Sequence, residues 1–161
     1  PSPGGAQPRP TTLPRRPRSF DQPHGPGNGS RVENMISMFD GASSFNQPIG
    51  DWDVSSVTSM NYMFSGARSF NQNIELWDVS PVFCMMSMFD GAVAFNQPIG
   101  RWDVGCVTDM DFMFHGASSF DANISSWAVA QVTQREQMFD ESGYTHAKPA
   151  FRAPESRGWL W

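Results

Sequence analysis

A 25-residue period runs through most of this 161-residue chain and constrains its fold more than any other feature. Apolar residue types recur at this spacing without an insertion. The recurrence is seen, for example, at Val32, Val57, Val82, Val107 and Val132, and at Trp52, Trp77, Trp102 and Trp127. A repeat this short cannot bury its own apolar face, so successive repeats must stack on one another. We therefore expect a solenoid of about four and a half turns over residues 32–143.

Two elements are predicted in each repeat. The segment V-T-x-M-x-x-M-F-x-x-A, at residues 32–42 in the first copy, has apolar residues three and four apart, which predicts a short α- or 3₁₀-helix. A glycine stands near the end of each copy, at Gly41, Gly66, Gly91 and Gly116, and suits the end of such a helix. The segment I-x-x-W-x-V, at residues 49–54, alternates between apolar and polar residues and predicts a short strand. The sequence thus predicts an α/β repeat, with strands stacked into a parallel sheet along one side.

The repeat resembles that of the BspA-like leucine-rich-repeat surface proteins. The string V-T-x-M-x-x-M-F-x-x-A-x-x-F-N-x-x-I-x-x-W-D-V is almost intact at residues 57–79, and I-x-x-W-x-V has the spacing of the leucine-rich-repeat core. This resemblance implies a right-handed leucine-rich-repeat-like solenoid with no catalytic machinery. It also implies a protein of the cell surface or extracellular space, used for adhesion or protein binding. The family has no fixed functional residues, so none is transferred to this chain.

Charge divides the chain into three parts. Residues 1–31 are rich in Pro, Gly and Arg and carry five arginines and one aspartate, a net charge of +4. The repeat region is acidic, which argues against binding of nucleic acid by that region. Residues 144–161 leave the repeat and end in aromatic residues. We expect residues 1–31 to be an extended segment that becomes ordered on a partner, and Phe20-Asp21-Gln22-Pro23 to be the remnant of a further repeat or a capping turn.

Polar residues also recur with the period. Asn46, Asn71, Asn96 and Asp121 are expected to form a column of side chains that hydrogen-bond along the stack. A second column, Asp53, Asp78 and Asp103, would repel itself unless something compensates the charge. Hydrogen bonds to nearby backbone and serine groups would compensate it, and calcium is a weaker alternative. The repeated Met and Trp residues are interpreted as core packing, rather than as ligands of a soft metal or a sugar.

Two cysteines, Cys84 and Cys106, stand in neighbouring repeats at the outer limit for a disulfide, so their pairing stays open. No cofactor site and no catalytic arrangement is recognisable, and no stretch is long and apolar enough to span a membrane. The chain is therefore predicted not to be an enzyme.

We expect a structural subunit that binds a protein partner and is docked in a larger assembly by its extended ends. An organellar assembly and a membrane complex are both compatible with this expectation. The alternative is an adhesion module that recognises protein or glycan through its sheet face. The candidate partner-binding residues are Arg9, Arg15, Arg16, Arg18, Asp51, Leu76, Arg101, Ser126, Trp159, Leu160 and Trp161. The last three could instead cap the open end of the final repeat.

Overall fold

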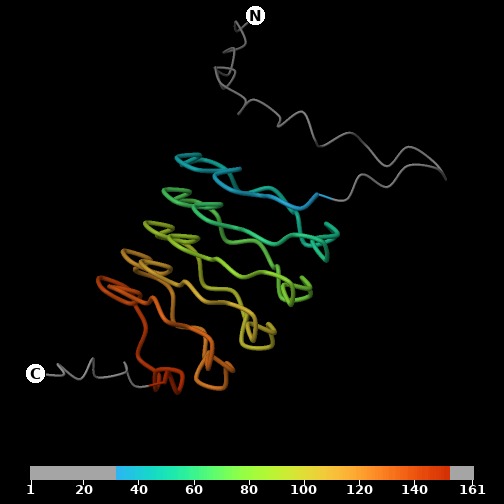
Figure 1. The fold of residues 1–161 in the computed structure, drawn as a ribbon. Helices are drawn as coiled ribbons and strands as arrows, with labels where there is room; N and C mark the ends of the chain where they lie inside the picture. Colours follow the sequence, from blue (N-terminus) through green and yellow to red (C-terminus); the bar gives the residue numbers. More distant parts are fainter. Residues whose placement is uncertain (1–31, 153–161) are drawn as a thin grey trace, which may run out of the picture.

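The computed structural model describes residues 32–152, which form a stack of similar coils (Figure 1). We number the coils from their first valine. Coil 1 comprises residues 32–56, coil 2 residues 57–81, coil 3 residues 82–106, coil 4 residues 107–131, and coil 5 the remaining residues 132–152. Each coil lies against the next one in the sequence, and a continuous apolar core of Met, Phe, Ile, Val and Trp side chains runs through the stack.

The described residues contain no helix and no continuous strand, so the predicted α/β repeat is wrong. Regular pairing is limited to isolated parallel bridges between single residues, at Asn34, Ser59, Cys84, Asp109 and Gln134. These bridges lie in the segment that was predicted to be helical, whereas residues 49–54 and their equivalents contain turns. The leucine-rich-repeat-like solenoid with one strand and one helix per turn is therefore not what this chain forms.

Backbone hydrogen bonding explains why the helix does not form. In residues 35–41, every second N–H donates to the next coil: Met35 N to Ser59 O at 3.1 Å and Ser37 N to Asn61 O at 2.9 Å. The N–H of Met38, between the donors Ser37 and Phe39, instead donates within its own coil, to Met35 O at 3.4 Å. A helix would use all of these donors internally. The three- and four-residue spacing of apolar side chains thus arises from turns that alternate with contacts between coils.

A left-handed backbone position recurs in every coil. The residues at this position have φ between 48° and 56°, although none of them is glycine: Ser37, Tyr62, Ser87, Phe112 and Gln137. Such a φ interrupts a right-handed helix, because residues other than glycine adopt it only singly. A second left-handed position follows four residues later; it is occupied by glycine in coils 1–4, beginning with Gly41 at φ 69°, and by Glu141 at φ 58° in coil 5. The predicted role of this glycine in ending a segment thus applies to a turn rather than to a helix.

Aromatic rings fill the core in two parallel columns. Phe89 lies 5.5 Å from Phe64 and 5.7 Å from Phe114 between ring centroids, and it stacks at 3.9 Å on Phe95 of its own coil. The tryptophans lie beside these columns, and each buried indole N–H donates to an isoleucine carbonyl 28 residues earlier, as from Trp102 Nε1 to Ile74 O at 3.1 Å. This bond satisfies the polar atom of the indole. The tryptophans of coils 2–4 are thus core residues, as predicted.

Odd- and even-numbered coils differ in sequence at one turn. Coils 1 and 3 contain Pro-Ile-Gly at residues 48–50 and 98–100, and coils 2 and 4 have Asn-Ile at the matching positions. A Cβ added to Gly50 would lie 2.5 Å from the carbonyl oxygen of Asn73, and one added to Gly100 would lie 2.5 Å from that of Asn123. The asparagine-containing coil therefore approaches the glycine of the preceding coil more closely than any side chain permits.

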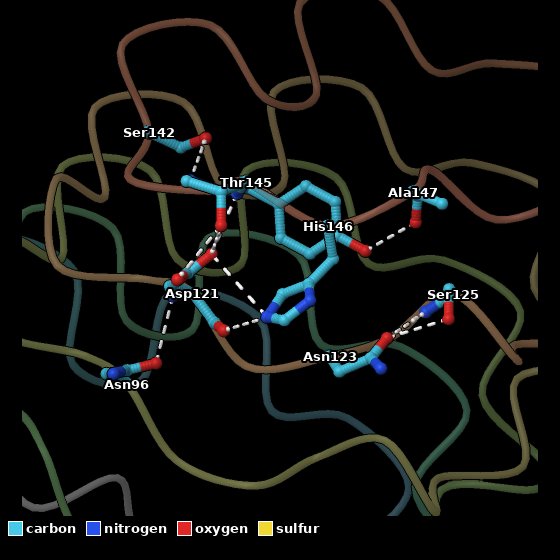
Figure 2. Close-up of polar contacts among 9 residues, drawn as sticks. Asn96, Asp121, Asn123, Ser125, Ser142, Thr145, His146 and Ala147 are labelled. Carbon is cyan, nitrogen blue, oxygen red and sulfur yellow. Dashed lines mark hydrogen bonds and ion pairs between the residues drawn. The ribbon is translucent and has the colours of Figure 1, made fainter.

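The C-terminal end of the stack is covered by residues 143–152. The ring of Tyr144 continues the aromatic columns, 6.0 Å from Phe120 and 4.6 Å from Phe139. Figure 2 shows the polar contacts beside it, in which Thr145 donates its backbone N–H to Asp121 Oδ1 at 2.7 Å. The Thr145 hydroxyl also donates to Asp121 Oδ1, at 2.9 Å. Both hydrogen bonds lower the pKa of Asp121, the bond from the backbone N–H more than the bond from the hydroxyl. Trp159–Trp161, predicted to cap or anchor this end, lie outside the described residues.

Candidate interaction surfaces

The hydrogen-bonded segments align along one side of the stack and form a surface that we call the ladder face. It consists of residues 33–37 of coil 1 and their equivalents, 58–62, 83–87, 108–112 and 133–137. Three of the five exposed large hydrophobic side chains of the described region lie here, one in each of the first three coils: Ile36 at 45% exposure, Tyr62 at 36% and Phe83 at 51%. Exposed apolar side chains gathered on one regular face are typical of binding surfaces.

Polar groups surround these side chains and fix the backbone beneath them. The hydroxyls of Thr58 and Thr108 donate to Glu33 O at 3.2 Å and Phe83 O at 3.1 Å, each in the preceding coil. The Tyr62 hydroxyl lies 3.8 Å from Met86 Sδ, which joins coils 2 and 3 on this face. An apolar centre with a polar margin on a rigid backbone is the arrangement found at protein–protein interfaces.

Sequence reasoning missed the ladder face because residues 32–42 were assigned to a helix. One signal was present: Phe83 occupies a position that is threonine in coils 2, 4 and 5. Phenylalanine cannot make the hydrogen bond to the preceding coil that the threonine hydroxyls make, so its presence indicates a role outside the stacking of the coils.

The four repeat positions predicted to select a ligand form a second exposed row, the corner row: Asp51, Leu76, Arg101 and Ser126. They lie on turns rather than on the predicted sheet face. Leu76 is 90% exposed, and the Arg101 side chain, 87% exposed, lies 4.0 Å from Glu75 through Nε and Oε1. The other candidates, Arg9, Arg15, Arg16, Arg18, Trp159, Leu160 and Trp161, lie outside the described residues.

The aspartate column at the turns binds its own backbone. Asp78 Oδ1 accepts hydrogen bonds from the Ser80 hydroxyl at 2.6 Å and from the Ser80 N–H at 3.1 Å, and these bonds lower the pKa of Asp78. Asp53 accepts the same two bonds from Ser55, and Asp103 accepts one from the N–H of Gly105. Between residues 32 and 152, no group of three or more His, Cys, Asp or Glu side chains is placed to hold a metal ion. The hydrogen-bonded alternative thus describes this column.

The asparagine column runs along the stack as predicted. Asn71 N donates to Asn46 Oδ1 at 2.9 Å and Asn96 N to Asn71 Oδ1 at 3.0 Å; the same bond then joins Asp121 to Asn96 and Thr145 to Asp121. Each coil therefore satisfies a backbone donor of the next one. This column holds the coils in register.

Both cysteines are free thiols. Cys84 is buried and Cys106 is exposed, and burial raises the pKa of the Cys84 thiol. The open question of their pairing is therefore answered: no disulfide joins them.

One ion pair makes the stack sensitive to pH. His115 Nδ1 lies 2.9 Å from Asp90 Oδ1, and this hydrogen bond raises the pKa of His115 above its ordinary value of 6.5, with smaller contributions from Glu141 and Asp140. The stabilisation is therefore complete below about pH 6.5 and is lost as the pH rises through the folded-state pKa.

We expect the wild type to gain about 0.5 kcal/mol of stability between pH 8 and pH 6 relative to His115→Ser, because the pair is partly exposed. Serine is the matched control residue, since Ser65 occupies the equivalent position of coil 2. Denaturant unfolding at both pH values measures the difference. An identical pH dependence in the two proteins would show that the pair contributes nothing.

Residues 32–152 contain no helix that is long and apolar enough to span a bilayer.

Comparison with known proteins identifies the family. Residues 15–104 and 74–148 match the model of DUF285, described as a Mycoplasma protein of unknown function. No curated protein matches the chain, and neither does any solved structure. The two matched stretches overlap and together extend over most of the sequence, as expected for a model that follows a repeat. The comparisons do not link the chain to the BspA-like leucine-rich-repeat proteins. The chain is a repeat protein that belongs to the DUF285 family.

Proposed function

We propose that this chain is a non-enzymatic interaction module that binds a protein partner through its ladder face. The observation that carries the proposal is the placement of Ile36, Tyr62 and Phe83 in three successive coils, exposed on a hydrogen-bonded backbone. None of the three belongs to the buried core, and only the Tyr62 hydroxyl, 3.8 Å from Met86 Sδ, also contacts a neighbouring coil. A partner with an apolar patch of similar width would remove these side chains from water, and burial of apolar area is the main favourable term in protein association.

The regular backbone makes this surface ready for binding. Because consecutive coils are joined by backbone hydrogen bonds of 2.7–3.1 Å in residues 35–41, the backbone that carries the outward side chains is fixed before a partner arrives. A preformed surface loses little conformational entropy on binding. The ladder face therefore suits a binding protein of constant shape.

Docking in a larger assembly remains part of the proposal. The basic residues Arg9, Arg15, Arg16 and Arg18 would add contacts with an acidic partner, in line with the net charge of residues 1–31. This second contact concerns residues 1–31 alone and is tested separately from the ladder face.

The second candidate function is adhesion through the corner row. Its support is Leu76, the most exposed large hydrophobic side chain among the described residues, with the exposed Arg101 in the next coil. An apolar and a cationic side chain presented together suit a protein or a glycan ligand.

One experiment separates the two functions. The native mass of the protein, isolated gently from the cells that produce it, is compared for the wild type, for Tyr62→Ser/Phe83→Thr and for Leu76→Ser. Each replacement occurs at the same position in another coil, as Ser37, Thr58 and Ser126. The fold should therefore be retained, and thermal unfolding checks that it is.

We expect the wild type to have a mass far above the 17.9 kDa of the chain and the ladder-face variant to return to about that mass. Loss of the assembly in Leu76→Ser alone would favour adhesion through the corner row. A wild-type mass of one chain would contradict binding in an assembly. Deletion of residues 1–31 shows whether the basic segment is also required.

A further inference from the structure

The first member of the asparagine column, Asn46, lacks the hydrogen-bond acceptor that the later members have within residues 32–152. The backbone N–H groups of Asn71, Asn96, Asp121 and Thr145 each donate to a side-chain oxygen in the preceding coil. The equivalent N–H of Asn46 has no partner among residues 32–152.

The side-chain amide of Gln47, next to Asn46, also lacks an acceptor among residues 32–152. Gln72 and Gln97 donate their amide groups to the asparagine of the preceding coil, Gln72 Nε2 to Asn46 Oδ1 at 2.9 Å and Gln97 Nε2 to Asn71 Oδ1 at 2.8 Å. Gln47 is their equivalent in coil 1, and its amide has no acceptor in the described part of the chain. Within residues 32–152, two donors of coil 1 therefore lack the acceptor that their equivalents in coils 2 and 3 have in the preceding coil.

Apolar residues of coil 1 show the same asymmetry. Met63, Ala67 and Phe70 of coil 2 are fully buried, whereas their coil 1 equivalents Met38, Ala42 and Phe45 are only partly buried. At the opposite end, Tyr144 covers the aromatic columns and Thr145 fills the polar column. Figure 1 shows no described coil before coil 1. Coil 1 thus presents a stacking surface of the kind that every later coil has covered.

The sequence contains the matching acceptor in the expected register. Phe20-Asp21-Gln22-Pro23 precedes Phe45-Asn46-Gln47-Pro48 by 25 residues, and the DUF285 match begins at residue 15, before the first described coil. A carboxylate can serve at this position, since Asp121 does so for Thr145. We propose that the N-terminal edge of coil 1 is a docking surface for residues 20–23 of this chain. The Phe20 ring packs on Phe45, and the Asp21 carboxylate accepts hydrogen bonds from Asn46 N–H and the Gln47 amide.

The prolines of the preceding segment limit this docking to the aromatic half of a coil. The donors equivalent to Met35 and Phe39 would be residues 10 and 14, and both are prolines, which have no N–H. Two of the four hydrogen bonds that each later coil receives here therefore cannot form in this register. The docked segment ends the stack and holds the adjacent arginines, Arg15, Arg16 and Arg18, beside coil 1.

Hydrogen exchange of the Asn46 amide in the full chain tests this inference. Because exchange requires opening of the hydrogen bond, we expect Asp21→Ala and Phe20→Ala to accelerate exchange at Asn46 by about tenfold or more. Asp21→Asn should restore protection, since asparagine is the acceptor in coils 1 to 3. The Asn96 amide, bonded to Asn71 at 3.0 Å, is the internal control and should not change.

Two results would overturn the inference. Equal exchange at Asn46 in the wild type and in Asp21→Ala would mean that Asp21 is not its acceptor. Protection that persists in Asp21→Ala and grows with protein concentration would mean that a second copy of the chain covers the edge instead. Neither result depends on the ladder face, so the proposed function is tested independently.

Discussion

Replacing Phe89 with alanine is expected to destabilise the protein by about 3–5 kcal/mol, because it removes a fully buried ring from the centre of the stack. Phe89 contacts rings in both neighbouring coils, Phe64 and Phe114, as well as Phe95 and Trp102. Backbone hydrogen bonds hold these neighbours in place, as from Phe64 N to Met88 O and from Phe114 N to Met138 O in the next coil, so they cannot move far enough to fill the cavity. The loss is therefore expected near the upper part of the usual range for aromatic core residues.

Denaturant unfolding of Phe89→Ala measures this effect, with Phe83→Thr as the matched control. Phe83 is the same residue type in the same coil, but its side chain is on the ladder face and about half exposed. The control should change the free energy of unfolding by no more than about 0.5 kcal/mol, because surface substitutions away from special features have small effects. Similar losses in the two variants would contradict the assignment of one ring to the core and the other to the surface.

Gly100→Ala is expected to destabilise the protein by about 1–3 kcal/mol through overpacking. The new methyl carbon would lie 2.5 Å from the carbonyl oxygen of Asn123, a backbone atom fixed in the next coil, so coils 3 and 4 would have to separate locally. The effect is one of close approach, since Gly100 does not have a positive φ.

A second glycine in the same coil provides the control for this prediction. Gly105 occupies the position of Ser55 and Ser80, whose hydroxyls donate to Asp53 and Asp78. Gly105→Ser should therefore add the same bond to Asp103 and leave the melting temperature unchanged or slightly higher. If Gly100→Ala melts at the wild-type temperature, the close approach between coils 3 and 4 is absent in solution.

The 25-residue period was sufficient to predict the residues of the core. Phe64, Phe89 and Phe114 recur with the period because equivalent positions of stacked coils meet in space, and the same argument correctly placed the tryptophans of coils 2–4 in the core. Period-based reasoning succeeds here because the contacts repeat along one direction.

Secondary structure could not be predicted from the same pattern. Apolar spacings of three and four residues fit a helix, but they also fit a backbone that alternates between turns and bonds to the next coil. The deciding feature is the left-handed position, and Tyr62 and Phe112 give no sign of it in the sequence, since neither favours a positive φ. Glycine or asparagine at this position would have argued against a helix.

The candidate surfaces were only partly predictable for a related reason. Asp51, Leu76, Arg101 and Ser126 were found because they vary at one position of a regular repeat, and all four are exposed. The side chains of the ladder face vary in the same way, but in the predicted helix they would point in different directions around the helix axis. Only the bridges between Asn34, Ser59 and Cys84 bring Ile36, Tyr62 and Phe83 to one face.

Photo-crosslinking from the ladder face is a direct test of whether this face binds a protein partner. A photoreactive phenylalanine analogue is placed at position 83 or, for comparison, at position 76, in cells that produce the protein. Both sites are exposed, and each analogue replaces a large apolar side chain. If the ladder face binds the partner, the analogue at position 83 crosslinks to a partner protein, and adding Tyr62→Ser abolishes this crosslink. The analogue at position 76 then gives no crosslink. A partner captured from position 76 alone, or none from position 83, would contradict binding through the ladder face.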